Sequence, residues 1–163
     1  MRTSVRALLI ALLSVGAWRA HAQSTQAPSP PRVFVESLRH TDSLSRYAAI
    51  QLRAALVART EPTMLRVVPT DVIDRTKQAS VHDSAGPWEW DRVREFARQV
   101  AAQHIVDVAA DHDFTTFRVI SYVVHPVRTG DPAPLPIFDG RSLNEAVAKL
   151  ADYLATRTWP PTK

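Results

Sequence analysis

Residues 93–110 read VREFARQVAAQHIVDVAA, and this stretch decides the fold class. In its first half, apolar residues recur at positions i, i+3, i+4, i+7 and i+8, the spacing of one helix face. From His104 onward the stretch is rich in β-branched residues, which favours a strand. It therefore predicts a helix that leads directly into a strand. The apolar helix face consists of Val93, Phe96, Ala97, Val100 and Ala101.

Four elements are predicted before this helix. The two strands are rich in β-branched residues, and the first helix has one apolar face and stops before Pro62. Pro87 is expected to open the helix that contains Val93, because a proline at the first helical position loses no hydrogen bond. The four elements are a strand at Arg32–Leu38, a helix from Asp42 or Ser43 to about Arg59, a strand at Met64–Pro69 and a short helix at Val72–Gln78.

Three strands and a helix are predicted after it. Residues Asp111–Thr116 suit a hairpin connection between the first two strands. The third strand contains Pro136 and is therefore expected at a sheet edge. Ser142 and Glu145 form a capping box at the start of the last helix. The predicted elements are strands at His104–Ala110, Phe117–Val124 and Leu135–Phe138, a turn at Val127–Asp131, and a helix that buries Leu143, Val147, Leu150 and Leu154.

The predicted order is β-α-β-α-α-β-β-β-α. This order predicts an α/β (α+β) fold, with a single mixed sheet of about five strands and three main helices packed on it. The chain has 163 residues, the length of one domain. We place that domain at residues 32–158, followed by a short tail at 159–163.

Residues 1–22 have the pattern of a signal peptide. Two arginines begin the segment, an apolar run follows at residues 7–15, and Ala20-His21-Ala22 supplies the small residues of a cleavage site. The run is shorter than the roughly 20 residues of a membrane span. We therefore expect cleavage near Ala22 and a mature chain that is periplasmic or secreted. Residues 23–31 are Pro-rich and are predicted to form a flexible leader.

Charge and cysteine content exclude several classes of protein. The whole chain carries 20 basic and 16 acidic residues, and the first 22 residues hold three arginines and no acid, so the mature chain has 20 − 3 = 17 basic and 16 acidic residues. The basic residues do not cluster, so a nucleic-acid partner is not expected. The chain has no cysteine. We therefore expect no disulfide, no Cys-ligated metal and no lipoprotein-type membrane anchor.

The element pattern resembles the TolB N-terminal-domain family, which is related to domains of curli-secretion and flagellar accessory lipoproteins. The resemblance rests on a first strand, a helix with Leu and Ala at helical spacing, a strand with an "rVv" motif, and a helix that runs into a third strand. Here these are Val33–Leu38, Leu44–Leu56, Leu65–Val68, and Phe96–Ala102 followed by Gln103–Ala109, and the turn Val127–Asp131 comes later.

The resemblance covers about Arg32 to Arg157. It implies the fold and a location in the cell envelope, and it implies no catalytic residues. The sequence departs from the family at Ala109 or Ala110, where the family often carries glycine.

The densest group of polar side chains lies in and after the predicted strand 104–110. Imidazole and carboxylate groups are ligands for zinc and other divalent ions. Alternation along a strand would place His104 and Asp107 on opposite faces, and acidic residues are common at hairpin tips for reasons of turn structure. The sequence favours a solvated turn with one polar strand residue over a metal site. The weak candidate ligands are His104, Asp107, Asp111 and His112.

Trp88 and Trp90 are candidates for contact with a partner. They flank Glu89 next to a polar loop. Tryptophan is enriched at binding hot spots, and two indoles two residues apart do not share one helix face. The favoured alternative is that both rings cover the edge of the sheet.

The leading hypothesis is an exported, non-catalytic domain that binds another envelope protein, with a partner strand added to an exposed sheet edge. The first strand and the Pro136 strand are the expected edges. No cofactor is expected and no catalytic residue is assigned. The alternatives are a metal-dependent periplasmic enzyme that uses His104, Asp107, Asp111 and His112, and a small-ligand binder with a pocket near Trp88.

Overall fold

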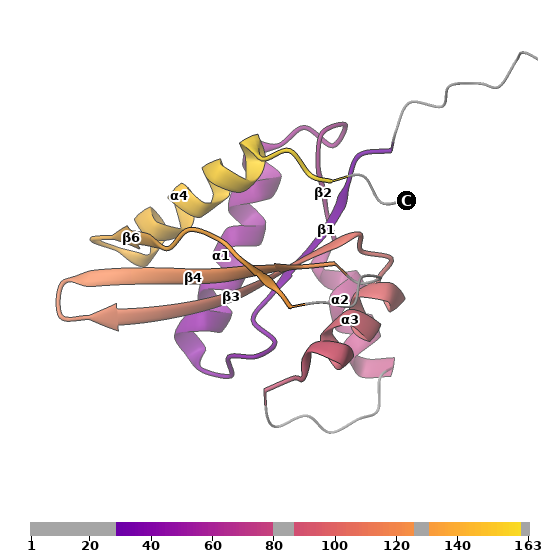
Figure 1. The fold of residues 1–163 in the computed structure, drawn as a ribbon, viewed down its shortest axis with the longest axis horizontal. Coiled ribbons are helices and arrows are strands. Elements are labelled where there is room, and N and C mark those ends of the chain that lie inside the picture. The colour runs from indigo at the N-terminus through magenta and orange to yellow at the C-terminus, as the bar shows by residue number, and fades with distance from the viewer. Residues whose placement is uncertain (1–28, 80–86, 126–130, 161–163) are drawn as a thin grey trace, which may run out of the picture.

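The computed structural model describes residues 29–79, 87–125 and 131–160. Within these ranges the chain forms one mixed sheet and four helices (Figure 1), which confirms the predicted α/β (α+β) class. The elements are β1 Arg32–Glu36, α1 Ser43–Arg59, β2 Arg66–Val67, α2 Thr70–Ala79, α3 Trp90–Gln99, β3 His104–Asp113, β4 Thr116–Val124, β5 Ala133–Pro134, β6 Phe138–Gly140 and α4 Leu143–Thr156.

The sheet has the strand order β2-β1-β3-β4-β5, and β6 also pairs with β4. Strands β2, β1 and β3 run parallel, whereas β4 is antiparallel to β3, β5 and β6. The connection from β1 to β2 through α1 and the connection from β2 to β3 through α2 and α3 run in opposite directions along the sheet. Because such crossovers are right-handed, their helices fall on opposite faces.

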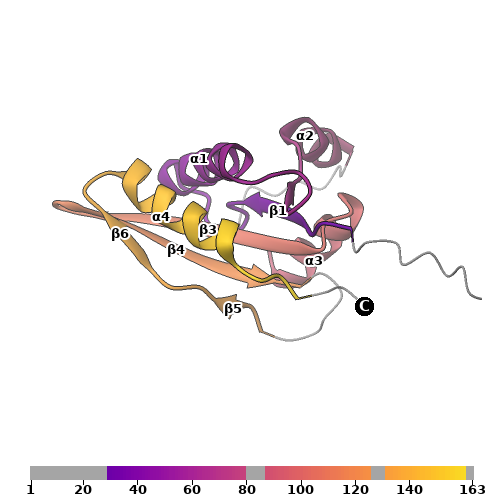
Figure 2. The ribbon, with the colours of Figure 1, turned by 90° about the horizontal axis from the view of Figure 1, so that it is seen from above.

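Each face of the sheet therefore has its own hydrophobic core, and Figure 2 shows α1 and α3 on opposite sides of the strands. Helices α1 and α4 cover one face, where Leu52, Leu150 and Leu154 are fully buried. Helices α2 and α3 cover the other face with Ile73, Val93 and Phe96. Side chains of β1 alternate between the two cores: Val33 and Val35 pack in the first core, and Phe34 packs in the second.

The predicted starts of α1 and α4 are confirmed, because local hydrogen bonds define both. Asp42 caps α1 by accepting a 2.7 Å hydrogen bond from the backbone N–H of Ser45. Ser142 caps α4 in the same way, with the N–H of Glu145 3.2 Å from its hydroxyl oxygen. None of the helices in the described ranges is long and apolar enough to cross a membrane.

Several predicted boundaries are wrong. Helix α3 begins at Trp90 rather than Pro87, because the backbone N–H of Trp88 donates to the Leu38 carbonyl and holds residues 87–89 extended. The strand expected at Met64–Pro69 is reduced to Arg66–Val67. The segment Leu135–Phe138 is not one strand, since β5 ends at Pro134 and β6 begins at Phe138. The expected turn at Val127–Asp131 lies largely outside the described residues.

The hairpin and the sheet edges also differ from expectation. Cross-strand pairing continues to Asp113 opposite Thr116, so Asp111 lies in the β3–β4 ladder and not in a connecting loop. Strand β1 is interior, between β2 and β3, and is therefore not an edge. The terminal strand on that side of the sheet is β2.

Candidate functional site

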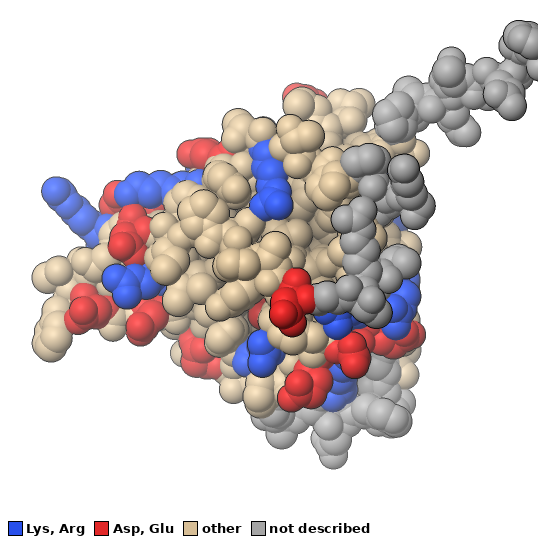
Figure 3. Space-filling view, in the orientation of Figure 1, with Lys and Arg blue, Asp and Glu red and all other residues tan. Residues whose placement is uncertain are grey.

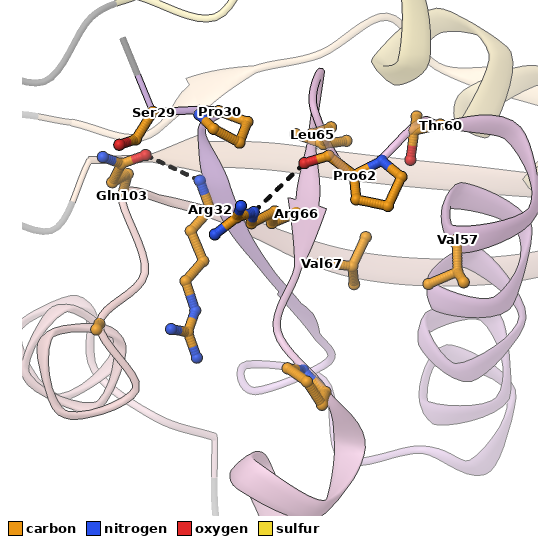
Figure 4. Close-up of a pocket in the computed structure, with 12 residues that line it drawn as sticks. Ser29, Pro30, Arg32, Val57, Thr60, Pro62, Leu65, Arg66, Val67 and Gln103 are labelled. Atoms are coloured by element: carbon orange, nitrogen blue, oxygen red, sulfur yellow. Dashed lines mark hydrogen bonds between the residues drawn. The ribbon is translucent and has the colours of Figure 1, made fainter. Parts of the chain in front are cut away.

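An open pocket lies beside β2, at the end of the sheet where β1 begins (Figure 4). Its volume is about 560 Å³, within the range of about 300–1,000 Å³ typical of binding pockets. Three separate segments build it: residues 29–32, the region from the end of α1 to Pro69, and the connection from α3 to β3. The lining residues are Ser29, Pro30, Arg32, Val57, Thr60, Pro62, Leu65, Arg66, Val67, Pro69, Ala101 and Gln103.

The apolar side of the pocket lies between α1 and β2. Figure 4 shows the side chains of Val57 and Val67 pointing toward one another across this space. Val57 is 66% exposed although it is a large apolar residue. Two more exposed apolar side chains, Tyr47 and Ile50, precede it on α1 at helical spacing. Helix α1 therefore buries one apolar face in the core and presents a second apolar stripe to solvent, which ends at the pocket.

The charged side of the pocket is basic. Arg32 and Arg66 are register partners on β1 and β2, and both line the pocket. The Nε of Arg66 donates to the Pro62 carbonyl at 3.3 Å, and no ion pair to either arginine is found among the described residues. The twelve lining residues include no Asp or Glu. Because Arg66 and Val67 are neighbours on β2, their side chains point to opposite faces of the sheet, so the basic and apolar sides of the pocket lie on either side of this edge strand (Figure 4). The pocket is therefore suited to an extended group that places an apolar side chain on one side of β2 and a neighbouring carboxylate on the other.

Backbone hydrogen-bonding groups are also available here. The N–H groups of Arg66 and Val68 donate inward to the Pro31 and Val33 carbonyls at 2.9 and 2.8 Å. Because neighbouring residues of a strand alternate in direction, the N–H and C=O of Val67 point outward from the sheet. A second extended chain can pair with these groups, although Pro69 removes the next outward donor.

Two reciprocal hydrogen bonds between Arg32 and Gln103 fix one side of the pocket. The backbone N–H of Arg32 donates to Oε1 of Gln103 at 2.8 Å, and the N–H of Gln103 donates to the carbonyl of Arg32 at 2.7 Å. Just before it, Ala101, which follows the C-cap residue of α3, has a φ of 53°, the left-handed conformation typical of the residue after a helix C-terminus. These contacts hold the β1 and α3 segments together on one side of the pocket.

The structure does not bring the four candidate metal ligands together. All four lie on β3, whose residues rise about 3.3 Å each, so His104 and His112 are about 26 Å apart. His104 and Asp107 are buried, while Asp111 and His112 are exposed. Among the described residues no group of three or more His, Asp or Glu side chains is placed to hold a metal ion.

His104 and Asp107 lie on opposite faces, as the strand alternation predicts. The ring of His104 packs 4.9 Å from Trp159 and 5.6 Å from His125, measured between ring centroids. Asp107 accepts a 3.0 Å hydrogen bond from the backbone N–H of Leu38. Burial of the Asp107 carboxyl raises its pKa, and this hydrogen bond offsets the effect only in part.

The two candidate tryptophans differ in exposure. Trp88 is buried and packs edge-on against Phe96, with ring centroids 5.2 Å apart. Trp90 is half-buried between Tyr122 and the guanidinium of Arg39, which lies 4.5 Å from its ring. Trp88 is therefore part of the core. Trp90 remains a hypothetical partner contact.

The sequence analysis missed the pocket beside β2. The sequence of α1 does contain one indication of it. Besides the apolar residues of the buried face, this helix carries Tyr47, Ile50 and Val57 on its exposed side. On the face seen in Figure 3, blue and red side chains are interspersed at the margins of a largely uncharged surface.

Comparisons with known proteins assign no family. No family model matches the chain, and no curated protein matches it. Among solved structures, it is similar to the LpoB C-terminal domain from Salmonella enterica, with 17% identity, a TM-score of 0.48, and coverage of 72% of this chain and 86% of that one. It is also similar to the PelC dodecamer from Paraburkholderia phytofirmans, with 13% identity, a TM-score of 0.43, and coverage of 80% and 90%.

Proposed function

We propose that the chain is an exported docking module of the cell envelope, which binds a segment of another envelope protein in the pocket beside β2. The observation that carries the proposal is the combination of an open apolar pocket with two arginines and no acidic lining residue. Export is proposed from the signal-peptide pattern of residues 1–22. We assign no reaction to the chain.

The chemistry of the pocket defines the partner segment. Val57, Leu65 and Val67 offer apolar contact, so the segment presents at least one large apolar side chain. Arg32 and Arg66 require an adjoining carboxylate, since guanidinium groups bind carboxylates well. The outward backbone of Val67 favours an extended segment over a helix. The occupant is therefore an extended segment with an apolar side chain next to Asp or Glu.

Site-directed photocross-linking in the native host tests this proposal. A photoreactive residue in place of Val57 is expected to form an adduct with a discrete protein. The same residue in place of Gln78, an exposed position near the end of α2, serves as the matched control. Arg66→Glu is then added to the Val57 variant, and we expect the adduct yield to fall by about tenfold or more. The cross-linked partner peptide is expected to contain an apolar residue beside an acidic one.

Three results would contradict the proposal. The first is a Val57 adduct no stronger than the Gln78 adduct. The second is an adduct that is insensitive to Arg66→Glu, which would show that charge recognition has no part in binding. The third is an adduct of small mass, which would make the pocket a small-ligand site.

A further inference from the structure

The tip of the β3–β4 hairpin presents an aromatic ring entirely to solvent. Phe114 is 97% exposed and has a φ of 36°, the left-handed conformation. It is the first of two residues between Asp113 and Thr116, which pair across the hairpin. Gly, Asn and Asp are the residues favoured at left-handed turn positions, because a larger side chain is strained there. Phe114 therefore has a strained backbone conformation, and its ring is almost entirely outside the packed core.

The charged residues that precede this ring on β3 are acidic, whereas Arg118, the register partner of Asp111 on β4, forms an ion pair with Asp139. Asp111 and Asp113 precede it on β3 and are both exposed. Asp111 accepts a 2.7 Å hydrogen bond from the backbone N–H of His112. Neither carboxylate forms an ion pair with a described residue. The tip is therefore an apolar side chain next to carboxylates, the chemistry that the pocket beside β2 accepts.

The tip and the pocket of one molecule cannot meet. Gln103 lines the pocket and immediately precedes β3, while Phe114 immediately follows β3. The ten residues of that strand span about 33 Å. Figure 1 shows the hairpin tip and β2 well separated along the molecule. A contact between the tip and the pocket therefore requires two copies of the chain.

We infer that the hairpin tip of one copy docks into the pocket beside β2 of a second copy. The Phe114 ring of the first copy occupies the apolar side between Val57 and Val67, and its Asp111 and Asp113 face Arg32 and Arg66. This inference rests on the proposed function, because it names a second copy of the chain as the envelope protein whose extended segment, here the end of β3, occupies the same pocket. The contact joins two different surfaces, so repetition yields a ring if the rotation closes and an open chain of copies if it does not.

Sedimentation velocity over a concentration series tests the inference on the full chain as its host produces it. We expect concentration-dependent association of the unmodified chain. Phe114→Gly removes the ring and also suits the left-handed backbone. It is expected to weaken association by about tenfold or more while thermal stability stays equal or rises. A purely structural role for Phe114 would instead lower thermal stability.

A charge exchange makes the test specific to this pair of surfaces. Asp113→Arg and Arg66→Glu each place like charges at the contact, so each variant alone is expected to stay monomeric. An equimolar mixture of the two is expected to associate, because every tip then finds a complementary pocket on the other variant. Asn144→Ala, a change at an exposed position on α4 outside both surfaces, is the control and should associate as the unmodified chain does.

An unmodified chain that is monomeric at several hundred micromolar would overturn the inference, as would a mixture that fails to associate. Neither result touches the proposed function, which is tested separately by the Val57 adduct. The chain could be monomeric and still form an Arg66-dependent adduct with a different protein. That pair of results would support the proposed docking function and would contradict only the inference that the partner is a second copy.

Discussion

Glu36 and Asp107 are register partners on β1 and β3, and the pKa values of their carboxyl groups move in opposite directions. Both side chains are buried, and burial by itself raises the pKa of each. At Glu36 this effect is outweighed by Lys77, whose Nζ lies 2.8 Å from Oε2, and by Arg53 at 3.1 Å. At Asp107 burial is the larger effect, and the charges of His40 and Arg39 lower the pKa only in part. Two neighbouring acids therefore contribute to stability with opposite dependence on pH.

Glu36→Gln is expected to lower the free energy of unfolding at neutral pH by about 3 kcal/mol, because it leaves the buried guanidinium of Arg53 without a charged partner. Urea denaturation measures the change. Glu95→Gln, which removes an exposed partner of Arg98, is the control and should change little. If Glu36→Gln lowers the free energy of unfolding no more than Glu95→Gln does, the buried ion pair stabilises the fold no more than a surface ion pair does.

The acid dependence of the Glu36 pair has a definite sign. Because the pKa of Glu36 is lowered in the folded state, its stabilising contribution is present above the unfolded value of about 4.5 and is lost as the pH falls through the folded pKa. The difference in stability between the unmodified chain and Glu36→Gln should therefore shrink as the pH falls below 4.5. Denaturation at a series of acidic pH values measures it, and a constant difference would contradict the assignment.

Asp107→Asn is expected to behave in the opposite way. The pKa of Asp107 is raised in the folded state, so the ionised form is disfavoured by folding and the unmodified chain gains stability as the pH falls through the folded pKa toward 3.8. Asparagine keeps an oxygen for the N–H of Leu38 and cannot ionise. The variant should therefore lack this gain. A parallel pH dependence of variant and unmodified chain would show that Asp107 does not titrate in this range.

Trp90→Ala tests whether the α3 side of the sheet takes part in docking. The Trp90 ring lies 6.2 Å from Tyr122 between ring centroids, and Arg39 stacks on it. Losing these contacts should cost about 1–2 kcal/mol. The Val57 adduct should be unaffected, since Trp90 does not line the pocket. Loss of the adduct in a folded variant would instead place the docking surface at Trp90, as the hypothesis from the sequence has it.

Much of the fold follows from local features of the sequence. The caps at Asp42 and Ser142 define the starts of α1 and α4 because each acts within three residues. The start of α3 was mispredicted since it depends on a hydrogen bond to Leu38, which is distant in sequence. The hairpin was predicted too short for a similar reason, as the pairing of Asp113 with Thr116 continues a ladder that residue types alone do not reveal.

The site was harder to predict than the fold. The pocket joins Arg32, Val57 and Gln103, which lie on three segments that meet only when β2 pairs with β1. The candidate metal ligands cluster in sequence on one strand, and alternation and the rise per residue separate them in space. Residues that are close in sequence on one strand are therefore far apart in space, whereas the exposed apolar residues of α1 are the sequence feature that indicates the pocket.

Gly140→Ala tests how tightly β6 joins α4. Gly140 pairs with Phe117 on the hairpin and lies two residues before the cap Ser142. An added Cβ would lie 2.6 Å from the backbone nitrogen of Ala146 and 2.8 Å from the carbonyl oxygen of Ser142, so the backbone must shift. We expect a loss of about 1–3 kcal/mol in urea denaturation. Asn144→Ala, at an exposed position on α4, is the control. A Gly140 variant within about 0.5 kcal/mol of the unmodified chain would show that α4 moves away from β6 at little cost.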